Sequence, residues 1–151
     1  MSELKPILLA EDNPRDAELT IEALSDNNLA NRVIHVRDGV ETLEYLRCQG
    51  KYNGRKPGNP AVLFLDIKMP RMDGIEVLRA IRSDAALKML PVVMLTSSRE
   101  EQDLIRSYEL GSNAYVVKPV KFSEFTEAVK HLGVFWAVLN EVPQDGILNL
   151  E

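Results

Sequence analysis

The stretch AVLFLDIKMPRMDG, residues 61–74, places Asp66 directly after five consecutive apolar residues. An apolar run of this length without polar alternation is typical of a strand buried on both faces, as in a parallel sheet covered by helices. Four more runs of four or five residues have mostly the same character: PILLA (6–10), RVIHV (32–36), PVVML (91–95) and AYVV (114–117). The sequence therefore predicts five buried strands.

Amphipathic stretches follow these runs, and most of them open with a helix start signal. In chain order the starts are Asn13-Pro14, Asp38 with Glu41, Asp73 with Glu76, and Ser98 with Glu101. The last stretch carries apolar residues at helical spacing from Phe122 to Trp136, and we expect that helix to run to about residue 139. Five strands that alternate with five helices imply right-handed crossovers and an open α/β sheet.

Length and charge restrict the possible functions. We expect one domain over residues 1–151, with a core of about 6–139 and an extension, 140–151, too short for a further domain. A net charge of -5 disfavours binding to nucleic acid or anionic lipid, because both need clustered positive charge. The longest apolar stretch, 132–139, is far below the ~18 residues that span a bilayer. A single cysteine excludes an internal disulfide and fits a cytoplasmic protein.

Polar side chains follow four of the runs, where the predicted strands end. Glu11 and Asp12 follow the first, Asp66 the third, Thr96 the fourth and Lys118 the fifth. Ligands of open α/β sheets bind beyond these carboxyl ends. If the first and third strands are neighbours, three carboxylates converge, and a hard divalent cation such as Mg²⁺ relieves their repulsion. With an ammonium and a hydroxyl opposite, the set suits phosphoryl transfer to a carboxylate.

Each of these residues has a plainer interpretation when it is taken alone. A strand-terminal aspartate such as Asp12 or Asp66 is often a helix N-cap. Thr96 alone fits a cap or an ordinary loop residue, and Lys118 alone fits a solvated charge. Their joint occurrence, each at a strand end and in this order, favours a common site.

Four segments in combination resemble the receiver domain of two-component response regulators. They are AEDNP (10–14), LFLDIKMPRMDG (63–74), VVMLTSS (92–98) and YVVKP (115–119). The resemblance extends from residue 6 to about residue 139. It implies a flavodoxin-like (βα)5 fold, a three-layer sandwich around a parallel five-stranded sheet in the order 2-1-3-4-5.

The resemblance implies a role for each residue at the strand ends. Asp66 would accept a phosphoryl group from the phosphohistidine of a histidine kinase. Asp12 and Asp66 would bind Mg²⁺ directly, with the backbone carbonyl of Lys68 as a third protein ligand and Glu11 acting through bound water. Mn²⁺ or Ca²⁺ could substitute. Lys118 would pair with Asp66 at rest and with the phosphoryl group after transfer.

The resemblance also implies a switch. Thr96 would bond a phosphoryl oxygen, and its movement would draw Tyr115 inward, although Tyr115 also fits an aromatic residue at the edge of the core. The Lys118-Pro119 peptide would be cis. New contacts to the phosphoryl oxygens would shift the loops after the fourth and fifth strands between two arrangements.

A narrower resemblance rests on EDNPRDAELTIEAL (11–24), the long loop 49–60 and the extended last helix. These features are similar to single-domain regulators paired with bacterial and cyanobacterial phytochromes. The resemblance implies a light-sensing histidine kinase as phosphodonor, output by protein contact and, in several members, a homodimer. The apolar helix end FWAVL (135–139) and tail DGILNL (145–150) favour a homodimer through this region, and a tail folded on its own domain is the alternative.

Two other functions compete with this interpretation. A phosphatase of the haloacid dehalogenase type also uses a strand-terminal aspartate and Mg²⁺, but it needs an acid two positions later, where this chain has Lys68. A pseudo-receiver would lack one of the acids, the threonine or the lysine, and all are present. His35 and His131 are isolated in sequence, which disfavours a zinc site. The loop 49–60 fits either a solvated loop or a docking element.

Overall fold

The computed structural model of the protein describes residues 5–25, 32–97 and 114–133. In chain order these ranges contain β1 (Ile7–Ala10), α1 (Pro14–Ser25), β2 (Val33–Val36), α2 (Gly39–Arg47), the 3-10 turn η1 (Gly50–Tyr52), β3 (Val62–Asp66), α3 (Gly74–Arg82), β4 (Val92–Thr96), β5 (Ala114–Val117) and α5 (Phe122–His131). None of these helices has the length and apolar character that crossing a bilayer requires.

The strands of the described ranges form one parallel sheet in the order β2-β1-β3-β4-β5. Ala10 at the end of β1 is in register with Leu65 of β3, and Asp66 is in register with Leu95 of β4. Because all pairs are parallel, the carboxyl ends of the strands meet at one edge. The predicted strands and the predicted order are confirmed.

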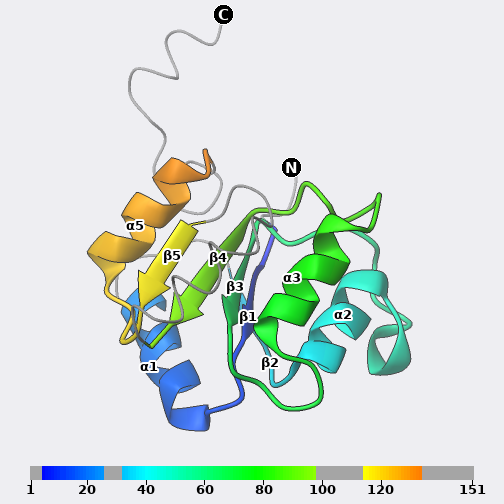
Figure 1. The fold of residues 1–151 in the computed structure, drawn as a ribbon, viewed down its shortest axis with the longest axis horizontal. Coiled ribbons are helices and arrows are strands. Elements are labelled where there is room, and N and C mark those ends of the chain that lie inside the picture. Colours follow the sequence, from blue (N-terminus) through cyan, green and yellow to red (C-terminus); the bar gives the residue numbers. More distant parts are fainter. Residues whose placement is uncertain (1–4, 26–31, 98–113, 134–151) are drawn as a thin grey trace, which may run out of the picture.

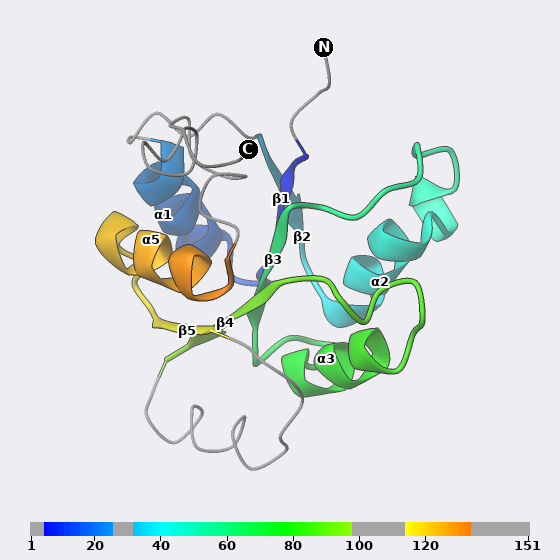
Figure 2. The ribbon, with the colours of Figure 1, turned by 90° about the horizontal axis from the view of Figure 1, so that it is seen from above.

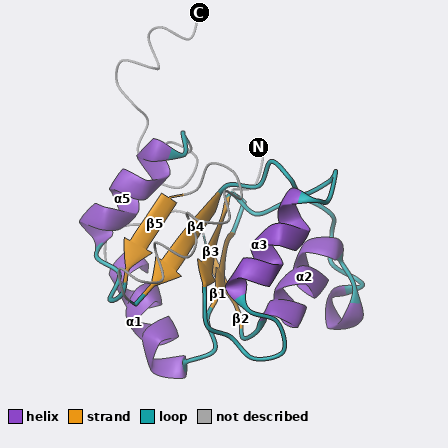
Figure 3. Ribbon diagram, viewed as in Figure 1, coloured by secondary structure: helices purple, strands orange, loops and turns teal. Residues whose placement is uncertain are grey.

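Helices cover both faces of the sheet and make three layers. Figure 1 and Figure 2 show α1 and α5 on one face and α2 and α3 on the other, and Figure 3 separates helices from strands by colour. Leu8 and Leu63 pack in the core beneath α2 and α3, whereas Phe64 packs beneath α1 and α5 with its ring centroid 5.3 Å from that of Phe125. Burial of both faces explains why the apolar runs lack polar alternation.

Three of the predicted helix starts are present with their caps. The Asn13 side chain accepts hydrogen bonds from two backbone N–H groups of the first turn of α1. The Asp38 side chain caps α2 by accepting from the Glu41 N–H, and Asp73 forms a reciprocal capping box with Glu76 at the start of α3. The start predicted at Ser98 lies outside the described residues.

The prediction for the last helix was wrong at its end. α5 ends at His131, and the Leu132 N–H still donates to the Ala128 carbonyl at 3.1 Å. Gly133 then adopts a φ of +77°, in the left-handed region that glycine enters without a steric penalty. The spacing of apolar residues predicted a longer helix because it does not take into account the backbone preference of Gly133. Trp136 and the rest of the stripe lie outside the described residues.

The loop 49–60 is exposed along most of its length but is anchored to α2 at Tyr52 and Arg55. The Tyr52 hydroxyl donates to Glu41 Oε2 at 2.7 Å, and its ring meets the Tyr45 ring edge-on with centroids 5.1 Å apart. The Arg55 guanidinium lies 4.0 Å from the centroid of the Tyr45 ring, and its Nε donates to the Tyr45 carbonyl. The loop therefore extends the α2 side of the core.

Candidate functional site

Three carboxylates meet at the carboxyl edge of the sheet. Glu11 and Asp12 follow β1, Asp66 ends the adjacent strand β3, and one carboxylate oxygen from each lies within 4.8 Å of the other two. Glu11 is fully buried and Asp66 is buried, whereas Asp12 is exposed. The sheet therefore brings together the acids that the strand ends predicted.

Local hydrogen bonds hold these acids in place. His35 Nε2 lies 2.7 Å from the backbone carbonyl oxygen of Glu11 and donates to it, because a carbonyl can only accept. Glu11 Oε2 accepts from the Asn13 N–H at 3.2 Å, and Asp66 Oδ1 accepts from the Ile67 N–H at 2.9 Å. His35 is thus a structural histidine on β2, in line with the absence of a histidine motif in the sequence.

Lys118 lies among carboxylates at the end of β5. Its Nζ is 3.3 Å from Asp66 Oδ1, 3.2 Å from Glu11 Oε1 and 3.1 Å from Asp16 Oδ2. The peptide between Lys118 and Pro119 is cis. Burial alone would lower the pKa of the Lys118 ammonium, but the charges of Asp66 and Glu11 outweigh it and raise that pKa. The lysine therefore remains positively charged.

The charge balance among these residues is incomplete without a further cation. Burial and the neighbouring Glu11 carboxylate raise the pKa of Asp66 to about 7, although Lys118 opposes the rise. A divalent cation held by oxygen atoms would supply the missing positive charge, and Mg²⁺ is usually bound by one or two carboxylates together with water. The donor set fits such an ion. Lys68 lies beside it, since Asp12 and Lys68 both line an open hollow of about 600 Å³.

Thr96 ends β4 next to the strand that carries Asp66. Its side chain is fully buried, and its Oγ1 has no hydrogen-bond partner among the residues that the structure describes. An unpaired buried hydroxyl costs about 1–3 kcal/mol, so it points to a ligand oxygen that completes it. The Lys118 N–H donates to the Thr96 carbonyl at 2.8 Å, which links the ends of β4 and β5.

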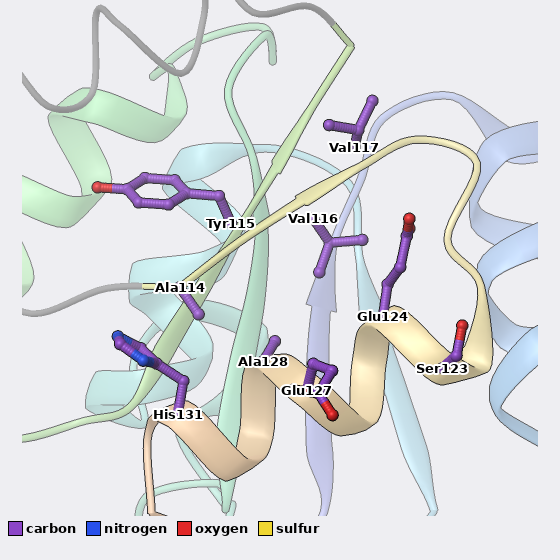
Figure 4. A pocket seen from close by; sticks show the side chains of 9 residues that line it. All are labelled: Ala114, Tyr115, Val116, Val117, Ser123, Glu124, Glu127, Ala128 and His131. Carbon is purple, nitrogen blue, oxygen red and sulfur yellow. The ribbon is translucent and has the colours of Figure 1, made fainter.

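Tyr115 is half-buried on β5. Its ring points away from α5 (Figure 4) and packs against the core beneath α2 and α3, while Val116 packs beneath α1 and α5. Figure 4 also shows Val117 and His131, which line a hollow between β5 and α5. The hollow has a volume of about 680 Å³, larger than the one beside Asp12, but no lysine is among the described residues that line it.

The sequence prediction missed Asp16. This residue lies in the first turn of α1, and its side chain accepts from Lys118 Nζ at 3.1 Å. Its position three residues after the N-cap Asn13 places it at the helix end that faces the sheet edge. That position could have marked Asp16 as a candidate site residue. Whether its side chain reaches Lys118, however, depends on how α1 is oriented relative to β5.

Comparison with known proteins agrees with this geometry. The family model of the response regulator receiver domain matches residues 7–130. Response regulator Rcp1 from Synechocystis sp. (strain ATCC 27184 / PCC 6803 / Kazusa) is 37% identical over 132 residues, which cover 87% of this chain and 88% of Rcp1.

Solved structures extend this comparison to the fold. The bacteriophytochrome response regulator AtBRR is 60% identical, covers 93% of this chain and 100% of its own, and superposes with a TM-score of 0.88. The Mn²⁺-bound form of Rcp1 is 37% identical with 92% and 97% coverage and a TM-score of 0.70. The phosphorylated cyanobacterial phytochrome response regulator RcpA is 40% identical with 89% and 94% coverage and a TM-score of 0.70.

Proposed function

The chain belongs to the response regulator receiver family, and on that premise we propose that it accepts a phosphoryl group on Asp66 from a histidine kinase. One observation carries the proposal: Asp66 Oδ1 lies 3.3 Å from Lys118 Nζ within a cluster of three carboxylates. Residues 7–130 match the family model, and we propose that the whole chain acts as one receiver domain.

The transfer is a displacement at phosphorus. A carboxylate oxygen of Asp66 attacks, the P–O bond forms as the bond between phosphorus and the histidine nitrogen breaks, and the nitrogen keeps the bonding electron pair. Lys118 compensates charge on the phosphoryl oxygens, and the Thr96 hydroxyl donates to one of them. We propose that the same residues assist both the phosphorylation of Asp66 and its later hydrolysis. The chain would then act on its own phosphoryl group and not as an enzyme on a separate substrate, in line with a signalling family.

We propose that Mg²⁺ binds to Asp12 and Asp66 directly, to the backbone carbonyl of Lys68, and to Glu11 through water. Mn²⁺ or Ca²⁺ can replace it, and the Mn²⁺-bound form of Rcp1 supports a divalent ion in this family. When bound, the cation supplies positive charge to the transferring phosphoryl group. The buried, mutually repelling carboxylates of this chain support the same site.

Phosphorylation then acts as a switch in this proposal. It adds about 1.5–2 negative charges, by analogy with hydroxyl acceptors, close to Lys118 and the unpaired hydroxyl of Thr96. Movement of Thr96 toward the phosphoryl group leaves space into which Tyr115 turns. The altered surface at the ends of β4 and β5 contacts a protein target.

The partners are proposed from the relatives. AtBRR is a bacteriophytochrome response regulator and RcpA a cyanobacterial phytochrome response regulator, so we propose a phytochrome-type histidine kinase as the phosphodonor. We further propose a homodimer through the last helix and the C-terminal region, and action in the cytoplasm. Residues 134–151, on which the dimer proposal depends, lie outside the described residues.

Acetyl phosphate with Mg²⁺ tests the phosphoacceptor directly. We expect a mass increase of one phosphoryl group that is stable to acid and labile to base, and that maps to Asp66. Asp66→Asn removes it, whereas Glu127→Gln, a change at an exposed carboxylate on α5, leaves it intact. Failure of the wild-type chain to gain mass with both acetyl phosphate and a competent phosphorylated kinase would contradict the proposal and favour a pseudo-receiver.

A further inference from the structure

The connection between β3 and α3 carries Lys68 past the acids and is closed tightly at its base. The Gly74 N–H donates to the Ile67 carbonyl at 2.7 Å. A Cβ on Gly74 would lie 2.3 Å from the backbone oxygen of Asp66, so the start of α3 touches the backbone of the acid itself. The base of this connection therefore keeps a fixed distance from the phosphoacceptor.

Its tip is held by a residue in an unusual backbone conformation. Arg71 has a φ of +67°, in the left-handed region that bulky side chains rarely adopt. Its guanidinium reaches the connection between β2 and α2, where Nε donates to Asp38 Oδ2 at 3.0 Å and Nη2 donates to Oδ1 at 3.1 Å. This forked geometry uses both carboxylate oxygens and is the directional form of an ion pair.

Asp38 is a firm anchor for this contact. Its Oδ1 also accepts from the Glu41 N–H at 2.8 Å as the N-cap of α2, and its side chain is only 15% exposed. The two backbones meet beside it, since a Cβ on Gly39 would lie 2.1 Å from the Met72 oxygen. The ion pair and this close approach fix the tip of the connection to the start of α2.

Between these two fixed points lies the wall of the hollow that contains Asp12. Lys68, Met69, Pro70 and Asp73 line that hollow. Among the residues between Ile67 and Met72 only Met69 is buried, and the Met72 N–H donates to the Pro70 carbonyl at 2.7 Å, which closes the tip around Arg71. The ion pair of Arg71 at this tip therefore contributes to the position of the Lys68 backbone in the wall.

We propose that Arg71 is a positioning residue for the divalent cation, acting through its ion pair with Asp38 to hold the Lys68 backbone in the wall of the hollow that Asp12 also lines. This inference rests on the proposed function. Metal affinity rises when ligands are held in place before the ion binds, and residues that orient ligands contribute to it. Because the Arg71 side chain is 58% exposed, the effect is below that of a buried orienting group.

Arg71→Asn distinguishes the effect of positioning on cation affinity from the effect of the arginine charge. Asparagine tolerates a left-handed backbone, so the fold is retained while the forked ion pair is lost. Removal of a positive charge near a cation site would by itself tighten cation binding. Loss of positioning does the opposite, and we expect affinity for Mn²⁺ and Mg²⁺ to fall about three- to tenfold.

The measurement is calorimetric titration of the full chain with Mn²⁺ alone and with Mg²⁺ alone, beside urea unfolding without metal. We expect Arg71→Asn and Asp38→Asn to weaken binding, and the double variant to weaken it by less than the product of the two. Arg71→Lys should recover only part of the affinity, because an ammonium cannot form the fork. Arg47→Asn removes an arginine–aspartate pair at the far end of α2 and should bind as the wild type does.

The outcomes distinguish failure of the proposed metal site from failure of the positioning role of Arg71. Wild-type protein that binds neither ion would overturn the proposed metal site and the role of Arg71 with it. Wild-type binding with an Arg71→Asn variant that stays folded and binds as tightly or more tightly would overturn the positioning role alone. Weakened binding with unchanged unfolding free energy supports it.

Discussion

Thr96 carries a buried hydroxyl that lacks a partner among the described residues, and this has a consequence for stability. Thr96→Val replaces that hydroxyl with a methyl group of similar shape, so we expect the unfolding free energy to stay the same or rise by up to about 1 kcal/mol. Urea denaturation measures it. Thr96→Ala, which leaves a cavity instead, should lower stability, and a Thr96→Val variant that loses more than about 1 kcal/mol would show that the hydroxyl is satisfied in the resting protein.

Particular residues show which parts of the site could be predicted from the sequence and which could not. The five predicted site residues could be placed at one edge of the sheet because each lies at or just after the end of a strand, and a parallel sheet aligns its strand ends. They are Glu11, Asp12, Asp66, Thr96 and Lys118. The contacts of Asp16 with Lys118 and of Arg71 with Asp38 could not be foreseen. Each joins residues on different elements through flexible side chains, so it depends on helix angles and loop shapes that no local pattern encodes.

At the scale of elements, the end of α5 shows how a single glycine competes with a hydrophobic stripe. The apolar spacing from Phe122 onward predicts continuation, whereas Gly133 adopts a left-handed φ after His131. Apolar periodicity reports which face of a helix is buried, but it does not report backbone preference. The caps at Asn13, Asp38 and Asp73 were predicted correctly because their side chains bond to the adjacent turn, which is a local interaction.

Gly133→Ala tests the left-handed end of α5. Because Gly133 has a positive φ, alanine introduces strain there and should lower the unfolding free energy by about 1 kcal/mol, as measured by urea unfolding. A rise of similar size, which alanine would give inside a continuous helix, would contradict this helix end. Among the described residues nothing lies within 4 Å of the position that the new Cβ would take, so none of them clashes with the alanine.

At the scale of the whole molecule, sheet order concentrates negative charge at one edge of an already acidic chain. The net charge of -5 and the buried acids Glu11 and Asp66 act in the same direction, because both favour a bound cation. The alternation of buried strands and amphipathic helices predicted an open parallel α/β sheet, whereas the strand order 2-1-3-4-5 was predicted from the resemblance to the receiver family. Because the buried acids favour a bound cation, Mg²⁺ should raise the stability of the whole fold as well as assist phosphoryl transfer.

The pH dependence of that stabilisation follows from Asp66. Its pKa in the folded protein is raised to about 7 from an ordinary value of 3.8, so between these pH values the folded state binds more protons than the unfolded state. The metal-free protein should therefore lose stability as pH rises from about 4 to about 7, because the group becomes charged in a buried site. Thermal unfolding in the presence of a chelator measures this loss.

Added Mg²⁺ should reverse the loss at high pH and have little effect near pH 4, where Asp66 is protonated and cannot act as an anionic ligand. At 100 times its dissociation constant, a ligand that binds only the folded state adds about 2.7 kcal/mol. Asp66→Asn removes this titrating group, so its stability should fall less than that of the wild type over this pH range and should not depend on Mg²⁺. An Asp66→Asn variant that keeps the full Mg²⁺-induced rise in melting temperature at pH 8 would place the ion elsewhere on the molecule.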